Sequence, residues 1–301
     1  MAPTKYDVAV IGGSFGGMSA ALQLARAART IAIIDDNKQI NARVAQSFGF
    51  LGSDGVTPAE FADRARGQLT RYANVHWIPD LATDFDGTQN DFRIGLAGGS
   101  TVQARRIILA CGTQFQLPDI PGLAKLWGRT AFNCPYCHAY EHKGRRLAIL
   151  RLDKAPLYEA LLYPDWGPVT LLMNGQRLPD QEARLVASRG TSVKTLTVAR
   201  LEPPCRVIYD DGTSDDFSAL FLNPRYAAPA IARNSRCEIA NTSNGSLLKV
   251  DASGQSSVEG IYGCGNLVTG KATIADVVAD GARVGRAVHA SFHFRAMVQN
   301  G

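Results

Sequence analysis

Long apolar runs are missing from this sequence. Its uninterrupted apolar stretches, such as Val8–Ile11 and Ile107–Cys111, are far shorter than the ~20 residues that a helix needs to cross a bilayer. Met1–Lys5 lead straight into a strand-like segment, without the apolar region and small-residue cleavage site of a secretory signal. We therefore expect a cytoplasmic protein with no membrane partner.

A strong charge of one sign is also absent. The net charge is only +5, from 32 basic and 27 acidic residues, and no basic run is interleaved with aromatic residues. A nucleic-acid partner is therefore not expected. Low-complexity tracts and repeats are missing too. The 301 residues have ordinary globular composition, and at ~150 residues per domain they predict about two domains.

Cysteine is scarce, with six residues in the whole chain. This number is too small for a fold held together by disulfides. Only Cys134 and Cys137 lie close together in the sequence. In a cytosolic protein, this spacing is typical of a redox pair or of a metal site.

The N-terminal part contains a βαβ pattern. Tyr6–Ile11 and Thr30–Ile34 are short, apolar and β-branched, as in strands of a buried parallel sheet. A glycine-rich turn at 12–17 separates the first strand from a helix over Met18–Ala28, whose apolar residues share one stripe. Such crossovers accompany parallel sheets covered on both faces, so we expect an α/β fold.

Further elements follow along the chain. Arg93–Leu96 and Thr101–Gln103 are typical of an antiparallel hairpin, and a helix is expected from Ile274 to about His289. The remaining strands are expected at Arg106–Ala110, Leu147–Leu150, Val169–Met173, Ala219–Leu222 and Gly260–Tyr262.

The first turn has the residues of a dinucleotide site. Gly12-x-Ser14-x-x-Gly17 provides a tight turn and a close approach of the backbone to a pyrophosphate, at a helix N-terminus that favours phosphate. Asp35, 23 residues beyond Gly12, can accept hydrogen bonds from a ribose, and its charge disfavours a 2′-phosphate. A turn that merely allows packing is the alternative, but the strand, the helix and the acid together favour nucleotide binding.

Two later segments favour FAD over NAD. Leu109-Ala110-Cys111-Gly112-Thr113 resembles the Ala-Thr-Gly segment of FAD-containing disulfide reductases, and Tyr262-Gly263-Cys264-Gly265-Asn266 resembles their Gly-Asp segment. Asn266 replaces the aspartate that holds the ribityl chain in those proteins; it can form hydrogen bonds but carries no charge. The residues expected to bind FAD are Gly12, Ser14, Phe15, Gly17, Asp35, Gly112, Gly265 and Asn266.

The segment Asn133–Glu141, Asn-Cys-Pro-Tyr-Cys-His-Ala-Tyr-Glu, predicts the reactive centre. Cys134 and Cys137 can close a small, easily reduced disulfide. His138 directly follows the second cysteine and can donate or accept the proton that thiol–disulfide exchange requires. We expect these three residues to be catalytic.

Other interpretations of this segment are weaker. Cys-x-x-Cys-His is also the attachment motif of c-type haem, but that attachment normally takes place outside the cytoplasm. Zinc would need two further ligands, which the sequence does not place nearby, so no metal is expected. Glutaredoxins share Cys-Pro-Tyr-Cys but are small domains. Two buried structural thiols remain possible, although the polar neighbours disfavour them.

Taken together, these motifs resemble the low-molecular-weight thioredoxin reductase family over almost the whole chain. The resemblance implies two Rossmann-like three-layer domains and a homodimer. The FAD domain would be split over residues 1–115 and 242–301, with a redox domain at 116–241. It also implies that Cys137 faces the flavin and that Cys134 reacts with the substrate sulfur. The Cys-x-x-Cys-His version followed by Glu141 is similar to gliotoxin-type dithiol oxidases.

The inserted domain departs from that family. Thioredoxin reductases carry a second glycine-rich turn for the NADPH pyrophosphate, but here no glycine occurs from Arg145 to Trp166, and Asp153 adds unfavourable charge. Met173-Asn174-Gly175-Gln176 stands in place of the basic 2′-phosphate reader, with Arg177 as the only basic residue near. We therefore expect no use of NADPH, as in the pyridine-nucleotide-independent enzymes of clostridia and cyanobacteria.

Three functions remain open at this point. The first is an FAD-dependent disulfide oxidoreductase that acts on a thioredoxin-like protein with ferredoxin as electron donor. The second is a dithiol oxidase that closes a disulfide in a small molecule and passes electrons to oxygen. The third is a flavin redox sensor without catalysis, motivated by Ser14 and Asn266. The aromatic tail His289–Phe294 is expected to pack as an ordinary C-terminus or to cover the flavin or the dimer partner's site.

Overall fold

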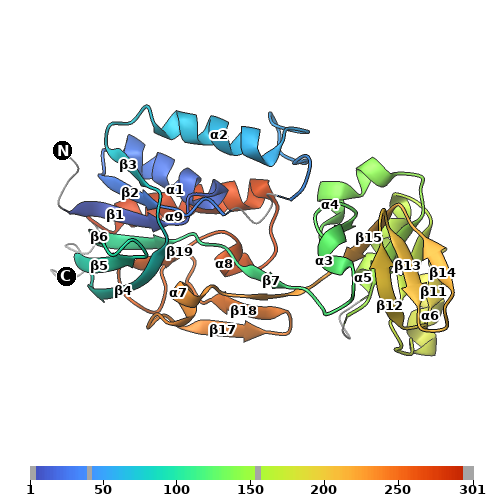
Figure 1. Cartoon of the computed structure of the whole chain (residues 1–301). Coiled ribbons are helices and arrows are strands. Elements are labelled where there is room, and N and C mark those ends of the chain that lie inside the picture. Colours follow the sequence, from blue (N-terminus) through green and yellow to red (C-terminus); the bar gives the residue numbers. More distant parts are fainter. Residues whose placement is uncertain (1–4, 39–42, 153–156, 294–301) are drawn as a thin grey trace. The chain divides into compact units, whose positions relative to one another are not determined.

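Figure 1 shows a computed structural model of the chain, which describes residues 5–38, 43–152 and 157–293. The chain divides into two compact units. Unit 1 comprises Met1–Ala42, Pro58–Phe115 and Tyr226–Gly301, and unit 2 comprises Arg43–Thr57 and Gln116–Arg225.

These bounds differ from the expected domains in two places, and packing explains both. Residues 226–241 were expected in the inserted domain, but Ala228, Ile231 and Cys237 are buried in the core of unit 1. Residues 43–57 were expected in the FAD domain, but Val44 packs against the core of unit 2. The boundary expected between residues 115 and 116 coincides with a boundary between the units.

Unit 1 is built on a sheet whose parallel part has the order β3-β2-β1-β6-β19, with the hairpin β4-β5 added along β6. The central strands are apolar because both faces are covered, and β1 and β2 are almost entirely buried. The strands are β1 (Tyr6–Ile11), β2 (Ile31–Ile34), β3 (Val75–Ile78), β4 (Ala82–Thr88), β5 (Asp91–Leu96), β6 (Thr101–Leu109) and β19 (Ile261–Gly263).

Strand β6 corrects one expectation. Thr101–Gln103 and Arg106–Ala110 were treated as separate strands, but one continuous strand spans Thr101–Leu109. Its first part pairs with β5 in antiparallel fashion, and its last part pairs in parallel with β19. The change of partner along one strand explains why its apolar pattern changes from alternating to continuous.

Three helices cover one face of this sheet (Figure 1): α1 (Phe15–Arg26), α2 (Pro58–Leu69) and α9 (Ile274–Ala290). Phe15 packs on Phe61 of α2 with ring centroids 4.6 Å apart. A capping box between Thr273 and Asp276 begins α9. Shorter elements of unit 1 are α7 (Ala230–Arg233), β17 (Ile239–Thr242), β18 (Gly245–Leu248) and α8 (Asn266–Thr269).

The chain passes between the units at four places, at both ends of the segment 43–57 and within β7 (Gln114–Gln116) and β16 (Arg225–Ala227). Unit 2 contains a parallel sheet of order β11-β10-β9-β15-β8 and a separate antiparallel sheet β12-β13-β14. The parallel sheet is buried on both faces: Leu147 and Ile149 of β9 belong to one apolar cluster, while Ala148 and Leu150 belong to the other. This arrangement confirms the expected α/β class with two Rossmann-like sheets.

The strands of unit 2 are β8 (Ala131–Phe132), β9 (Leu147–Leu150), β10 (Val169–Leu172), β11 (Ser192–Lys194), β12 (Val198–Glu202), β13 (Arg206–Tyr209), β14 (Ser214–Asp216) and β15 (Ala219–Leu222). Its helices are α3 (Leu123–Leu126), α4 (Pro135–His138), α5 (Tyr158–Leu162) and α6 (Asp180–Ala187), with single 3₁₀ turns at Tyr140–His142 and Tyr163–Asp165.

Candidate functional site

The turn between β1 and α1 depends on its glycines. Gly12 has φ +106°, and a Cβ there would lie 2.5 Å from the carbonyl oxygen of Ala110. A Cβ on Gly17 would lie 1.9 Å from the carbonyl oxygen of Gly12. Ser14 is the N-cap of α1, but its side chain makes no capping hydrogen bond. The turn thus brings the strand and the helix as close together as a dinucleotide site requires.

Asp35 directly follows β2 and faces this turn. Its carboxylate accepts hydrogen bonds from the backbone N–H of Gly13 and from that of Asn37, the latter at 2.5 Å. Nearby, the guanidinium of Arg66 lies 4.2 Å from the ring centroid of Trp77 and donates to the amide oxygen of Asn37. Asp35 therefore has the position, at the end of the second strand, from which an acid reaches a ribose.

Two buried polar atoms at the same edge of the sheet have no partner among the described residues. They are Oδ1 of Asn266 and Oγ1 of Thr113. Leaving such an atom unpaired costs about 1–3 kcal/mol, so each marks a place where a bound group would complete the hydrogen bonding. Gly265, just before Asn266, is held by a 2.7 Å hydrogen bond from its N–H to Asp280.

The structure brings all the predicted FAD-binding residues to one edge of one sheet. Gly12, Gly112 and Gly265 follow the carboxyl ends of β1, β6 and β19, which are adjacent parallel strands. This is the edge at which open α/β sheets bind ligands. Phe15 is 6% exposed and packs in the core, so its side chain serves the helix packing. The glycine turn, the acid and the unpaired amide fit FAD.

The cysteine pair lies in unit 2. Cys134 and Cys137 form a disulfide with their Cα atoms 5.3 Å apart. Cys134 is the N-cap of α4, and Pro135 occupies its first position, where the ring's fixed φ suits a helix start. Both cysteines are half-buried, so the disulfide is not sealed inside the core.

His138 ends α4 and stacks on Phe132, with ring centroids 4.2 Å apart. Burial lowers the pKa of His138 to about 4, and the nearby His142 adds to this effect. Burial, followed by the charge of Arg145, also lowers the pKa of His142, whose Nδ1 lies 2.6 Å from the hydroxyl of Ser218. Both imidazoles are therefore neutral at neutral pH.

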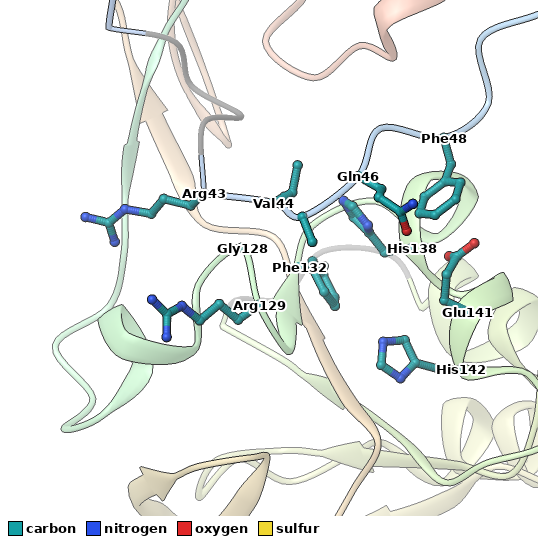
Figure 2. Close-up of a pocket in the computed structure, with 11 residues that line it drawn as sticks. Arg43, Val44, Gln46, Phe48, Gly128, Arg129, Phe132, His138, Glu141 and His142 are labelled. Atoms are coloured by element: carbon teal, nitrogen blue, oxygen red, sulfur yellow. The ribbon is translucent and has the colours of Figure 1, made fainter. Parts of the chain in front are cut away.

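A cavity of about 400 Å³ adjoins α4 within unit 2 (Figure 2). One wall comes from the loop 43–57, which is closed by a 2.7 Å hydrogen bond from Ser47 N–H to the carbonyl oxygen of Val56. The other wall comes from β8, α4 and the turn at Tyr140–His142. Its lining includes Arg43, Val44, Arg129, Phe132, His138 and Glu141.

Of the residues that line this cavity, His138 and Glu141 were identified from the sequence. Arg43, Arg129 and His142 were not. The two arginines are about ninety residues apart in the chain, and no local pattern links them. The only sequence signal for His142 is its spacing of four residues from His138, which places two residues on one side of a helical segment.

Charged side chains occupy the region where a second nucleotide turn was sought. The guanidinium of Arg151, directly after β9, is 10% exposed and lies 3.3 Å from the carboxylate of Glu182 on α6. Glu159, at the start of α5, accepts a hydrogen bond from Asn223. Asp153 lies outside the described residues. Arg177 pairs loosely with Asp180 at 3.7 Å, and both side chains are more than four-fifths exposed.

Three of the free cysteines outside the disulfide are poor nucleophiles. Burial raises the pKa of Cys111 and of Cys205 to about 12, and it also raises the pKa of Cys264. These thiols stay protonated at neutral pH and are poor nucleophiles.

The C-terminal aromatic residue Phe292 packs among three guanidiniums. Those of Arg29, Arg105 and Arg106 lie 4.4–4.8 Å from its ring centroid. Arg29 precedes β2, so Phe292 packs at the amino ends of the strands and does not cover the glycine turn. Phe294 lies outside the described residues. Among the described helices, none is long and apolar enough to span a membrane.

Comparison with known proteins agrees with these observations. Residues 6–151 match the family model of pyridine nucleotide-disulphide oxidoreductases. The crystal structure of an oxidoreductase from Agrobacterium tumefaciens is 36% identical, with a TM-score of 0.93 over 96% of this chain and 99% of that chain.

Two curated fungal relatives match as well. Thioredoxin reductase sirT of Leptosphaeria maculans is 26% identical over 95% of this chain and 94% of its own length. Thioredoxin reductase tcpT of Claviceps purpurea is 28% identical over 86% of each chain. The chain therefore belongs to the thioredoxin reductase-like flavoproteins, and its cofactor is FAD.

Proposed function

We propose that this protein is an FAD-dependent thiol–disulfide oxidoreductase that works through Cys134 and Cys137 and does not use NADPH. The observation that carries the proposal is the Cys134–Cys137 disulfide at the start of α4, directly followed by a neutral His138 that lines a cavity. A disulfide, a proton acceptor and space for a substrate are the requirements of thiol–disulfide exchange.

The exchange follows from these groups. One substrate thiol gives its proton to His138, and its sulfur attacks Sγ of Cys134, which breaks the Cys134–Cys137 bond and leaves Cys137 as a thiolate. The second substrate thiol then attacks the substrate sulfur of the mixed disulfide and expels the sulfur of Cys134, which takes up the proton of that thiol, and the substrate leaves as its disulfide. The substrate loses two electrons, and the cysteines gain them. FAD, when bound, supplies the two-electron acceptor that reoxidises the pair, and the reverse sequence would reduce a substrate disulfide.

The ion pair at the end of β9 supports independence from NADPH. A pyrophosphate needs backbone N–H groups or cations at this position. Here the guanidinium of Arg151 is already paired with Glu182. Glu159 adds a carboxylate at the first turn of α5. Together with the missing glycines between Arg145 and Trp166, these residues disfavour a second dinucleotide.

A small-molecule dithiol is the favoured substrate, with oxygen as the final electron acceptor. The cavity beside α4, with His138 and Glu141 in its lining, supports this choice over a thioredoxin-like protein with ferredoxin as donor. The homodimer implied by the family resemblance is retained as part of the proposal.

Single-cysteine variants test the proposal. An anaerobic dithiol should bleach the flavin of the wild-type protein, and Cys134→Ser should abolish this reduction because the first exchange step needs the disulfide. Cys205→Ser is the matched control, since Cys205 is a buried thiol in the same unit with a raised pKa. Bleaching of the Cys134→Ser protein at the wild-type rate would contradict the proposal. Rapid reduction of a thioredoxin by the ferredoxin-reduced enzyme, with no oxygen uptake on dithiols, would favour the protein substrate instead.

A further inference from the structure

We propose that the cavity beside α4 binds the non-reacting part of a small dithiol or disulfide, and that this part carries a carboxylate held between Arg43 and Arg129. This inference rests on the proposed function, because it names the substrate class of the same reactive pair. It predicts that the protein prefers a small acidic substrate over a small neutral one and over a protein substrate.

The size of the cavity limits its occupant. A volume of about 400 Å³ lies near the lower end of the ~300–1,000 Å³ that is usual for sites of small organic molecules. A folded protein cannot enter such a space. The lining includes His138, the residue directly after Cys137, so an occupant lies next to the helical turn that carries the redox pair.

One end of the cavity is cationic. Figure 2 shows the side chains of Arg43 and Arg129 extending to the same side, with Glu141 on the opposite side. The Cβ of Arg43 lies only 2.8 Å from the point where a side chain on Gly128 would begin, so Arg43 packs directly over the residue before Arg129. The loop 43–57 thereby places its arginine beside the arginine that precedes β8.

The two guanidiniums have hydrogen-bonding capacity to spare. Arg43 donates from Nη1 to the carbonyl oxygen of Ala124 at 3.3 Å. A guanidinium has five donors, so this contact leaves most of them free. Within the described ranges 5–38, 43–152 and 157–293, neither Arg43 nor Arg129 forms an ion pair with a carboxylate. Paired guanidiniums without an acidic partner are the groups that bind a carboxylate through charge-assisted hydrogen bonds.

The charge of the lining favours an occupant with one negative charge. Arg43 and Arg129 are opposed by the single carboxylate of Glu141, and the imidazoles of His138 and His142 are neutral at neutral pH. One positive charge is left, which a single carboxylate balances and a phosphate dianion exceeds. Between the charged ends, Val44 and Phe132 present apolar surface, which suits a short hydrocarbon body (Figure 2).

A matched pair of probes tests this substrate class. Dihydrolipoate and dihydrolipoamide carry the same dithiol and differ in a carboxylate against a neutral amide. Anaerobic flavin reduction of the wild-type holoprotein should have a ~10-fold or higher second-order rate constant for dihydrolipoate, the effect of a charge-assisted contact. In Arg129→Gln and Arg43→Gln this ratio should fall toward one. In Arg177→Gln, an exposed arginine of the same unit outside the cavity lining, the ratio should be unchanged.

Direct binding gives a readout that is independent of catalysis. The double variant Cys134→Ser, Cys137→Ser should bind oxidised lipoate more tightly than lipoamide in calorimetry, and Arg129→Gln in this background should remove the difference. Inorganic phosphate should compete only weakly with oxidised lipoate for this site.

The outcomes separate the two proposals. Equal rates and equal affinities for the acid and the amide would overturn the carboxylate site and leave the oxidoreductase standing. A preference for the acid that persists in both arginine variants would also overturn the carboxylate site. Failure of every dithiol, dithiothreitol included, to reduce the flavin would overturn the proposed function, while the calorimetric comparison would still decide whether the arginines bind a carboxylate.

Discussion

His138 stacks on Phe132 with ring centroids 4.2 Å apart and an interplanar angle of 21°. This contact covers the imidazole directly after Cys137. Burial is the main reason why the pKa of His138 is lowered to about 4, with the neighbouring His142 as the second cause. The burial therefore keeps the imidazole of His138 in its neutral form at pH values well above 4.

The first prediction concerns the titration of His138. Its imidazole should titrate near pH 4 in an NMR experiment on the intact protein, with His138→Gln used to assign the signal. The neutral form stabilises the fold above the unfolded-state pKa near 6.5, and this stabilisation is lost as the pH falls through the folded-state pKa near 4. Phe132→Leu should raise the midpoint, because it uncovers the ring. A midpoint between 6 and 7 in the wild-type protein would show that the stacking does not desolvate His138.

The second prediction concerns the catalytic role of His138. His138→Gln should slow flavin reduction by a dithiol about 10²–10⁴-fold, because general acid–base catalysis contributes that range. Deprotonation of the substrate thiol by solvent should partly rescue the rate at high pH. His293→Gln, an exposed histidine in unit 1, is the control and should react normally. A wild-type rate for His138→Gln at neutral pH would remove His138 from the mechanism.

The third prediction concerns the glycine turn. Gly17→Ala places a Cβ 1.9 Å from the carbonyl oxygen of Gly12, so the purified protein should contain little or no FAD. Gly67→Ala in α2 has open space around the added Cβ and no positive φ. It should keep full FAD content and raise the free energy of unfolding by about 0.5–1 kcal/mol. The measurements are flavin content per chain and thermal unfolding. Full flavin in Gly17→Ala would show that the turn opens without loss of the cofactor.

The fourth prediction uses the unpaired amide oxygen of Asn266. Asn266→Leu removes a buried polar atom that lacks a partner, so the FAD-free protein should be as stable as the wild type or more so. Its affinity for FAD should fall about 10-fold or more, because the hydrogen bond to the cofactor is lost. Asn266→Asp should keep the affinity for FAD, since aspartate retains an oxygen acceptor at this position. Fluorescence titration with FAD and unfolding of the FAD-free proteins measure both effects. Unchanged affinity in Asn266→Leu would place the cofactor away from this residue.

Local patterns predicted several buried strands well. β1, β9 and β15 have the predicted bounds, because a continuous apolar run in a doubly covered sheet leaves a clear signal. The residues expected to bind FAD lie at one edge of the sheet because the carboxyl ends of adjacent parallel strands meet there, and their role stays a prediction. The cysteine pair was recognisable from its spacing alone.

The features that the sequence did not predict depend on packing between distant segments. The loop 43–57 joins unit 2 through Val44 and brings Arg43 beside Arg129, and neither contact has a periodic signal. The continuous strand β6 was divided because its neighbours change along its length. Arg151, directly after β9, forms an ion pair with Glu182 of α6. The sequence showed that glycine is missing there but did not predict this pair.

Electron entry through the cysteine pair, without NADPH, is tested most directly by the absorbance of the flavin under anaerobic conditions. Stoichiometric NADPH should leave the spectrum of the wild-type holoprotein unchanged over minutes, whereas a dithiol should bleach it. Dithionite serves as the positive control, and Cys134→Ser should be bleached by dithionite only. Rapid bleaching of the wild-type flavin by stoichiometric NADPH would contradict the proposed route.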